Sequence, residues 1–447
     1  MITVIGIIIG FLILMLLVVA HEFGHFIAAK RNGVVVEEFG IGFPPRAKAW
    51  IKNPEYEKWK KAKKQGKEPD RKPKKWLKLA KSEWGKPQKT LIFSINLLPI
   101  GGFCSMKGES DSDERPGSFG AASLWAKTKI LFAGVTMNWL AAFIILSVLA
   151  ATGMPGYMEN WHSQFSASEP IFRPDYVMVG KIIEDSPAEK AGLEAESSIS
   201  VACTTEDFTS VSTAPSDCRN LYTTSDLIDY NENHAGETVY YRVYTKDQLE
   251  EFSSSKNTAG LEPKTIEVKL NSRDDQYSLG AYLYQGAPII YKSAGLMSPV
   301  VGAVNTIQLT GETYRGLGMM ISSLFDGVTK QFSGDEAVKQ EGREQIGAAG
   351  DSVSGPVGII GVIFPASVQS GPRTLAFLAA IISISLACMN VLPIPALDGG
   401  RFTLIAIFRL LGKKLKKETE EKIVARTFVF LLILIALVTI LDVTKFF

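Results

Sequence analysis

The chain has 447 residues, 46% of them apolar, and a formal net charge of +2. This length is enough for two or three domains, and the charge balance leads us to expect no nucleic-acid partner. The apolar residues are unevenly distributed. Four stretches are each about as long as a bilayer-spanning helix requires: residues 2–20, 128–151, 374–395 and 423–441.

The first stretch has no small-residue cleavage site after its apolar core, so we interpret it as a retained helix rather than a signal peptide. The pattern predicts a polytopic α-helical membrane protein embedded in the lipid bilayer. The four transmembrane segments, with their flanks, are assigned to residues 1–32, 121–151, 373–411 and 423–447.

Charge is distributed asymmetrically between the predicted spans. Residues 46–90 hold 17 Lys/Arg against 5 Asp/Glu, and residues 409–426 hold 7 against 3. Residues 152–372 reverse the bias, with 15 basic and 29 acidic residues. Cytoplasmic loops carry the positive excess. We therefore expect a multi-pass protein of the cytoplasmic (inner) membrane, with the N-terminus and residues 152–372 outside.

The loop between the first two spans, residues 33–120, is the predicted cytoplasmic basic loop. Its Lys-rich part, 55–81, is either a solvated insertion or a contact with anionic headgroups. Residues 89–108 are apolar but interrupted by Asn96, Pro99 and paired glycines, which favours a hairpin-like loop. Backbone of this kind survives at membrane depth only when it is buried in protein or lines a cavity.

The segment outside the membrane reads as a small β/α module over 176–291. Within it, 237–245 and 264–270 alternate like strands, and 224–233 is a helix candidate. Residues 292–372 are expected to hold an amphipathic helix and a polar connector. The helix, 297–325, is either interfacial or a core helix of the outer domain; the connector is 333–355.

The strongest chemical signal is HEFGH, residues 21–25. HExxH on a helix places two histidines on one face, where both can ligate one zinc, and the glutamate between them can take a proton from water. The alternative, a buried histidine pair satisfied by neighbours, is weak here because ionisable groups within a membrane span are rarely kept without a role. The pattern predicts His21 and His25 as Zn²⁺ ligands and Glu22 as the general base.

Catalytic zinc usually takes a third protein ligand. Asp398, in NVLPIPALDGGR, is the main acidic candidate within reach of the membrane. Pro393 and Pro395 break the helix before it, and Gly399–Gly400 let backbone approach closely. The alternative for Asp398 is a helix cap over 399–411.

The chain has four cysteines, of which Cys203 and Cys218 share the predicted outer segment. A disulfide persists in such an environment. Two unrelated thiols are the alternative.

Several motifs, in this order, resemble the site-2 proteases, a family of intramembrane zinc metalloproteases. They are HEFGH, GIGFPP (40–45), LLPIGGFCSMKGE, FAGVTMNW (132–139), SGPVGI (354–359) and NVLPIPALDGG. Their order most resembles the regulator-of-sigma-E protease branch. Three departures are the missing proline in FAGVTMN, a single outer module where the nearest relatives hold two, and the extra basic loop.

The resemblance implies that His21, His25 and Asp398 bind zinc, that Glu22 is the base, and that Asn390 holds substrate. It implies that residues 89–108 form a membrane-reentrant β loop pairing with an extended substrate, and that 176–291 is an extracytoplasmic PDZ-like domain. From the loop we take Ile92, Ser94, Gly101 and Gly102 as substrate-binding candidates.

The implied function is hydrolysis of peptide bonds within transmembrane segments of single-pass proteins. Anti-sigma factors, whose release belongs to a stress response, or signal-peptide remnants are the implied substrates. The alternatives are a transporter that uses His21, Glu22 and Asp398 as an ion relay and an idle scaffold that binds peptides. The transporter leaves the HExxH spacing unexplained, and the scaffold leaves Glu22 without a purpose.

Overall fold

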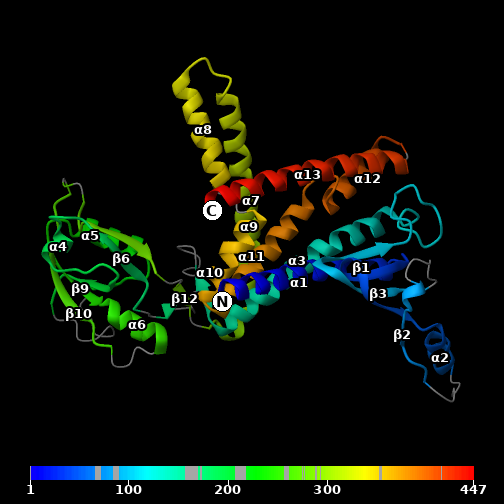
Figure 1. Ribbon diagram of the computed structural model, residues 1–447, viewed down its shortest axis with the longest axis horizontal. Helices are drawn as coiled ribbons and strands as arrows, with labels where there is room; N and C mark the ends of the chain where they lie inside the picture. Colours follow the sequence, from blue (N-terminus) through cyan, green and yellow to red (C-terminus); the bar gives the residue numbers. More distant parts are fainter. Residues whose placement is uncertain are drawn as a thin grey trace. The chain divides into compact units, whose positions relative to one another are not determined.

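The structure is a computed structural model of the chain and divides it into two compact units. The first holds residues 1–150 and 296–447 and the second residues 151–295 (Figure 1). The residues described are 2–65, 72–83, 90–156, 170–171, 174–206, 218–255, 261–273, 275, 277–286, 289–291, 293–351, 355–413 and 415–446.

The first unit contains four helices that are long and apolar enough to cross a membrane, in agreement with the four predicted spans. They are α1 (Ile2–Arg31), α3 (Leu124–Thr152), α11 (Pro372–Val391) and α13 (Lys417–Phe446). The predicted segment 373–411 is, however, two helices: α11 ends at Val391 and α12 (Asp398–Leu410) follows. Pro393 and Pro395 lie between them, and proline removes a helical donor and clashes with the preceding turn.

Three strands after α1 form a sheet with the order β2-β1-β3. They are β1 (Val36–Lys52), β2 (Trp76–Lys78) and β3 (Ile92–Met106). The two long strands bend back on themselves, so each residue near the bend has partners on two sides. Phe39 of β1 pairs with Cys104 on one side and with Phe93 on the other, and Phe93 of β3 pairs in turn with Trp50. The start of β3 is therefore interior, and within the described chain its end, residues 102–106, has a strand on one side only.

The region between the second unit and α11 is more helical than the sequence analysis predicted. Helix α7 (Ser298–Lys330) belongs to the first unit, so the alternative of an outer-domain core helix is wrong. Helix α8 (Glu336–Asp351) occupies most of the predicted polar connector and packs on α7, where a Cβ on Gly327 would lie 2.7 Å from Ile346. The Ala, Glu, Lys and Gln in α8 are good helix formers, and this outweighs their polarity.

Short elements complete the first unit. They are α2 (Pro54–Lys64), η1 (Lys81–Glu83), η2 (Gly295–Met297), α9 (Pro356–Gly358), η3 (Ile359–Ile363) and α10 (Phe364–Gln369). Phe364 of α10 is buried against α1, where a Cβ on Gly10 would lie 2.6 Å from its ring.

The second unit is a mixed β/α fold, as the alternating sequence predicts. Its main sheet has the order β10-β9-β7-β6-β11, with β8 beside β7, and a small sheet has the order β4-β12-β5. The core includes the fully buried Tyr241, whose hydroxyl donates to Asn231 at 2.6 Å. The strands are β4 (Met154–Gly156), β5 (Pro170–Ile171), β6 (Val177–Ile182), β7 (Ser198–Cys203), β8 (Arg219–Asn220), β9 (Thr238–Tyr244), β10 (Lys264–Lys269), β11 (Ala281–Gln285) and β12 (Ile289–Tyr291). The helices are α4 (Pro187–Lys190), α5 (Thr224–Asn233) and α6 (Lys246–Ser255).

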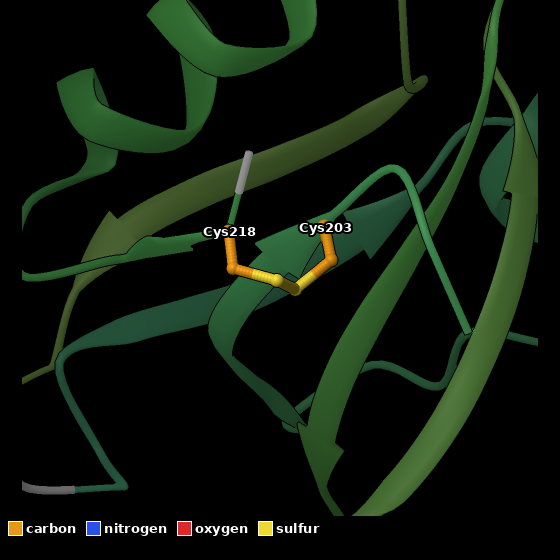
Figure 2. The surroundings of a disulfide bond; sticks show 2 residues. All are labelled: Cys203 and Cys218. Atoms are coloured by element: carbon orange, nitrogen blue, oxygen red, sulfur yellow. A yellow bond between two sulfur atoms is a disulfide. The ribbon is translucent and has the colours of Figure 1, made fainter. Parts of the chain in front are cut away.

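A disulfide joins Cys203 to Cys218 in the second unit (Figure 2). Cys203 ends β7, and Cys218 immediately precedes β8, which pairs with β7. The bond therefore closes a loop beside the point where its two ends already meet in the sheet.

Candidate metal centre

Three side chains from two helices meet near the C-terminal third of α1. Nε2 of His21 lies 3.1 Å from Nε2 of His25, and Oδ2 of Asp398 lies 3.0 Å from the first nitrogen and 3.3 Å from the second. Asp398 comes from the first turn of α12, and Leu397, not Asp398, is the N-cap residue of this helix. The two histidines are buried.

This triangle fits a tetrahedral metal. Nitrogen and oxygen ligands about 2.0–2.2 Å from a tetrahedral zinc lie roughly 3.3–3.6 Å from one another, so the three atoms need to separate by only a few tenths of an ångström. Two imidazoles and a carboxylate are also a donor set that zinc accepts in catalytic sites, where a fourth position stays open.

Each histidine is oriented by a contact on its other ring nitrogen. Nδ1 of His25 donates to the Ile130 carbonyl at 2.8 Å, which leaves the Nε2 lone pair directed at the centre. Nδ1 of His21 lies 3.3 Å from Nδ2 of Asn138, while Oδ1 of Asn138 is buried with no hydrogen-bond partner among the described residues. The Asn138 carbonyl accepts a hydrogen bond from Ser383 Oγ at 2.8 Å, which ties α3 to α11 here.

Helix α3 packs closely against the two histidines at Gly134, which has no side chain. A Cβ on Gly134 would lie 2.6 Å from Nε2 of both His21 and His25. On the facing side, a Cβ on Gly24 would lie 2.3 Å from the Ala133 carbonyl oxygen. The two helices therefore approach closely only because both positions lack a side chain. The motif FAGVTMNW was noted in the sequence, but nothing in a single sequence indicates that its glycine and asparagine touch the histidines.

Two further glycines position Asp398. A Cβ on Gly399 would lie 2.1 Å from the Val391 carbonyl oxygen, and one on Gly400 would lie 1.8 Å from that of Ile394. The start of α12 is thus packed directly on the turn that contains the two prolines. This is the close backbone approach that the glycine pair predicts.

Glu22 lies between the two histidines in the sequence, and its carboxylate lies near the Cys104 backbone amide. The Met106 amide, two residues further along β3, donates to the Glu109 carboxylate at 2.9 Å. Amides two apart in a strand point the same way, so both donors face away from β1. The one-sided end of β3 therefore lies against Glu22.

The remaining predicted site residues divide into two groups. Gly101 and Gly102 lie against α1, where a Cβ would come 3.0 Å from Val18 and 3.2 Å from Val19 respectively. Ile92 and Ser94, in contrast, are buried in the interior of the sheet with segments of β1 on both sides, so they offer no free edge to another strand.

Asn390 lies near the end of α11, where its side-chain amide donates to the Leu386 carbonyl at 2.9 Å. The structure therefore places it on the helix that precedes Asp398, but shows no contact with the three central side chains.

A cleft of about 800 Å³ lies beside the start of α12, with Ala396 and Arg401, which flank Asp398 in the sequence, among its lining residues. Arg401 donates to the Glu109 carbonyl at 2.8 Å, and Glu420 of α13 accepts from Ser110 Oγ at 3.0 Å. Asp113 also lines this cleft, and hydrogen bonds from Arg115 lower the pKa of its carboxyl group to about 2. These contacts hold the segment after β3 against α12 and α13.

A histidine pair and an adjacent glutamate on a helix that is long and apolar enough to span a membrane, together with a carboxylate from α12, are typical of a membrane zinc metalloprotease. Comparison with known proteins gives the same class, because the profile of Peptidase family M50 matches residues 9–57 and 77–435. The chain belongs to this family, the site-2 proteases, and the predicted resemblance is confirmed. Its cofactor is Zn²⁺.

Relatives match over nearly their whole length. A predicted zinc metalloprotease of Clostridium acetobutylicum is 26% identical over 439 residues, which cover 98% of this chain and 97% of the relative. The zinc metalloprotease RasP of Bacillus licheniformis is 25% identical over 512 aligned positions, covering 96% and 97%. A predicted zinc metalloprotease of Fusobacterium nucleatum is 24% identical, covering 97% and 96%.

Proposed function

We propose that this protein cleaves peptide bonds within the transmembrane segments of single-pass membrane proteins. The observation that carries the proposal is the triangle of His21, His25 and Asp398, whose facing atoms lie 3.0–3.3 Å apart. Both histidines belong to α1, a helix long and apolar enough to span a membrane, and Asp398 begins α12, which follows α11, another such helix. A centre at that position acts on bonds that soluble proteases do not reach. Family membership also argues against the transporter, which would need no general base.

In this proposal His21, His25 and Asp398 hold zinc. When bound, the ion supplies Lewis acidity, which activates water and polarises a carbonyl. Glu22 accepts the proton of the attacking water and passes it to the leaving amine, the usual work of a positioned carboxylate. The Cys104 amide, which lies near Glu22, is proposed to position the carboxylate during both transfers.

Asn138 is the proposed positioning residue for His21. Exchanging the oxygen and nitrogen of its amide places Oδ1 against His21 Nδ1, so the unpartnered buried oxygen gains a donor. Amide orientations of this kind are assigned from the hydrogen-bond network. The proton then resides on Nδ1, and the Nε2 lone pair is free for the metal.

The end of β3 is the proposed substrate edge of a membrane-reentrant β loop. A peptide bond within a helix is shielded by its own hydrogen bonds, so the substrate must unwind before attack. Residues 102–106 have a strand on one side only and lie beside Glu22, so a strand added there satisfies the unwound backbone next to the base. Ile92 and Ser94 support this edge from inside the sheet, and Asn390 is proposed to contact the substrate after Asp398 binds metal.

The second unit is proposed to be a PDZ-like domain outside the membrane, with the N-terminus on the same side. Two features support this assignment. The sheet alternates with short helices along the chain, with α4 between β6 and β7 and α5 between β8 and β9, and the unit contains a disulfide. The basic loops then face the cytoplasm of an inner membrane. Anti-sigma-factor-like proteins or signal-peptide remnants are the proposed substrates.

The test is cleavage of a single-pass peptide by the purified chain in vesicles, read out by mass spectrometry of the fragments. We expect fragment ends inside the apolar segment, and no fragments from the variant Glu22→Gln. Cleavage only outside that segment, or equal cleavage by the variant, would refute the proposal.

A further inference from the structure

An open groove runs between α1 and α3 on the surface of the first unit. Its volume is about 550 Å³, and apolar side chains form most of its walls, including Ile27, Ala28, Phe132 and Met137. Both helices are long and apolar enough to span a membrane, so a groove between them faces acyl chains.

One end of this groove is cationic. Arg31, in the last turn of α1, and Lys129, in the second turn of α3, both line it and are exposed. Lys129 Nζ lies 5.3 Å from the centre of the Trp125 ring, which also lines the groove. In the part of the chain that the structure describes, neither cation belongs to an ion pair, whereas the neighbouring Lys127 is buried and paired with Asp111.

We infer that this groove is a binding site for one anionic phospholipid. An acyl chain fills the apolar part, and the phosphate lies between Arg31 and Lys129. The chemistry requires both parts of the ligand: two unpaired cations at the end of a membrane-facing apolar groove attract an anion that carries a hydrocarbon chain. A tryptophan beside the cations places this end at the headgroup level, where its amphipathic ring is favoured.

The position of the groove gives the lipid a connection to the metal centre. Gly24 and Ala133 line its floor, and each is the sequence neighbour of a residue at the centre, His25 and Gly134 respectively. The groove and the centre thus share the α1–α3 contact but lie on different sides of it. Lipid binding does not depend on zinc or on the proposed proteolysis.

The experiment measures quenching of Trp125 fluorescence in the full-length protein by phospholipids with brominated acyl chains. Because the chain has 7 tryptophans, the signal of Trp125→Phe is subtracted as the blank. Phosphatidylcholine vesicles receive either brominated phosphatidylglycerol or brominated phosphatidylcholine. We expect a preference for phosphatidylglycerol that falls about fivefold in Arg31→Gln or Lys129→Gln and about 25-fold in the double variant.

Two controls separate a site from general surface charge. Lys30 neighbours Arg31, but its Nζ lies over the Phe26 ring at 4.5 Å and it does not line the groove, so Lys30→Gln should keep the preference. Ala28→Phe, which fills the groove, should abolish quenching by either lipid while zinc content is unchanged. Equal losses in Lys30→Gln and Lys129→Gln, or a double variant that retains the wild-type preference, would overturn the inference.

Discussion

Gly134 faces Nε2 of His25 so closely that a Cβ at this position would lie 2.6 Å from the nitrogen. No real Cβ contact is that short, and the nitrogen belongs to a ring held by the Ile130 carbonyl. A methyl group here must therefore displace a proposed metal ligand.

Gly134→Ala should accordingly lower zinc content and activity together, by about 10- to 100-fold in zinc affinity, because the histidines lose their orientation. The measurement is metal content after dialysis against a graded chelator. Gly311→Ala is the matched control, since no atom of the described residues outside its own helix backbone lies within 4 Å of a Cβ on that glycine. Full zinc occupancy in Gly134→Ala would show that α3 moves away from the histidines without a loss of zinc affinity.

Glu22→Gln should lower the cleavage rate by about 100- to 10,000-fold while zinc stays bound, because the amide cannot accept the proton and the proposed ligands are intact. Cleavage rate and metal content are measured on the same preparation. Glu37→Gln, an exposed glutamate on β1, should change neither. A Glu22→Gln protein that cleaves normally would assign the base elsewhere.

Asn138→Leu should weaken zinc binding by about tenfold or more, because it removes the acceptor for His21 Nδ1. Asn138→Asp should restore much of the affinity, since a carboxylate oxygen accepts the same hydrogen bond. Replacing zinc by cobalt allows the ligand field to be read from the visible spectrum. If Leu and Asp weaken binding equally, Asn138 contributes packing between α3 and α11 and does not orient His21.

Cys104→Pro should slow cleavage much more than Cys104→Ala, because proline removes the amide that faces Glu22 and the free edge of β3. If this edge holds unwound substrate, the loss should be larger for a helical transmembrane peptide than for one with Gly-Pro near the cleaved bond. Equal losses on both peptides would mean that Cys104 acts only through Glu22. Proline at Ile92 or Ser94 does not test this, because those residues lie in the interior of the sheet.

Unreduced protein should show no free thiol at Cys203 or Cys218 by mass spectrometry. Replacing both by serine should destabilise the second unit by roughly 3 kcal/mol, the chain-entropy value for a loop of 15 residues. Urea-dependent proteolysis of the full-length protein measures this loss. Zinc content should stay unchanged, because the proposed ligands lie in the other unit.

Much of the centre was predictable because its signals are local or chemically costly. The HExxH spacing places two proposed ligands on one helix face, and few acidic residues other than Asp398 occur within an apolar region. Gly134 and Asn138 were not identified as site residues, because their contacts with the histidines arise from helix packing. A single sequence does not encode which face of α3 meets α1.

The sheet beside the centre shows a different limit. Strand β1 was not predicted, since Glu37, Glu38 and two prolines hide its alternation. Glu38 is buried and forms an ion pair with Arg46 on the other side of the bend in β1. This ion pair compensates for the cost of burying the Glu38 charge, and the residues next to Glu38 in the sequence do not indicate it. The start of β3 lies in the interior of this sheet, between two segments of β1. This arrangement arises from long-range pairing, which the strand propensity of the residues does not specify.

The 377 positions that separate His21 from Asp398 have a consequence for biosynthesis. A ribosome inserts α1 early, with both histidines and Glu22 in place, but the carboxylate reaches the membrane only after α12 has been made. Until then the nascent chain carries an incomplete centre. With Asp398 as the proposed third ligand, the proposed centre thus stays incomplete while the protein's own spans are being inserted, and a product truncated before α12 never completes it.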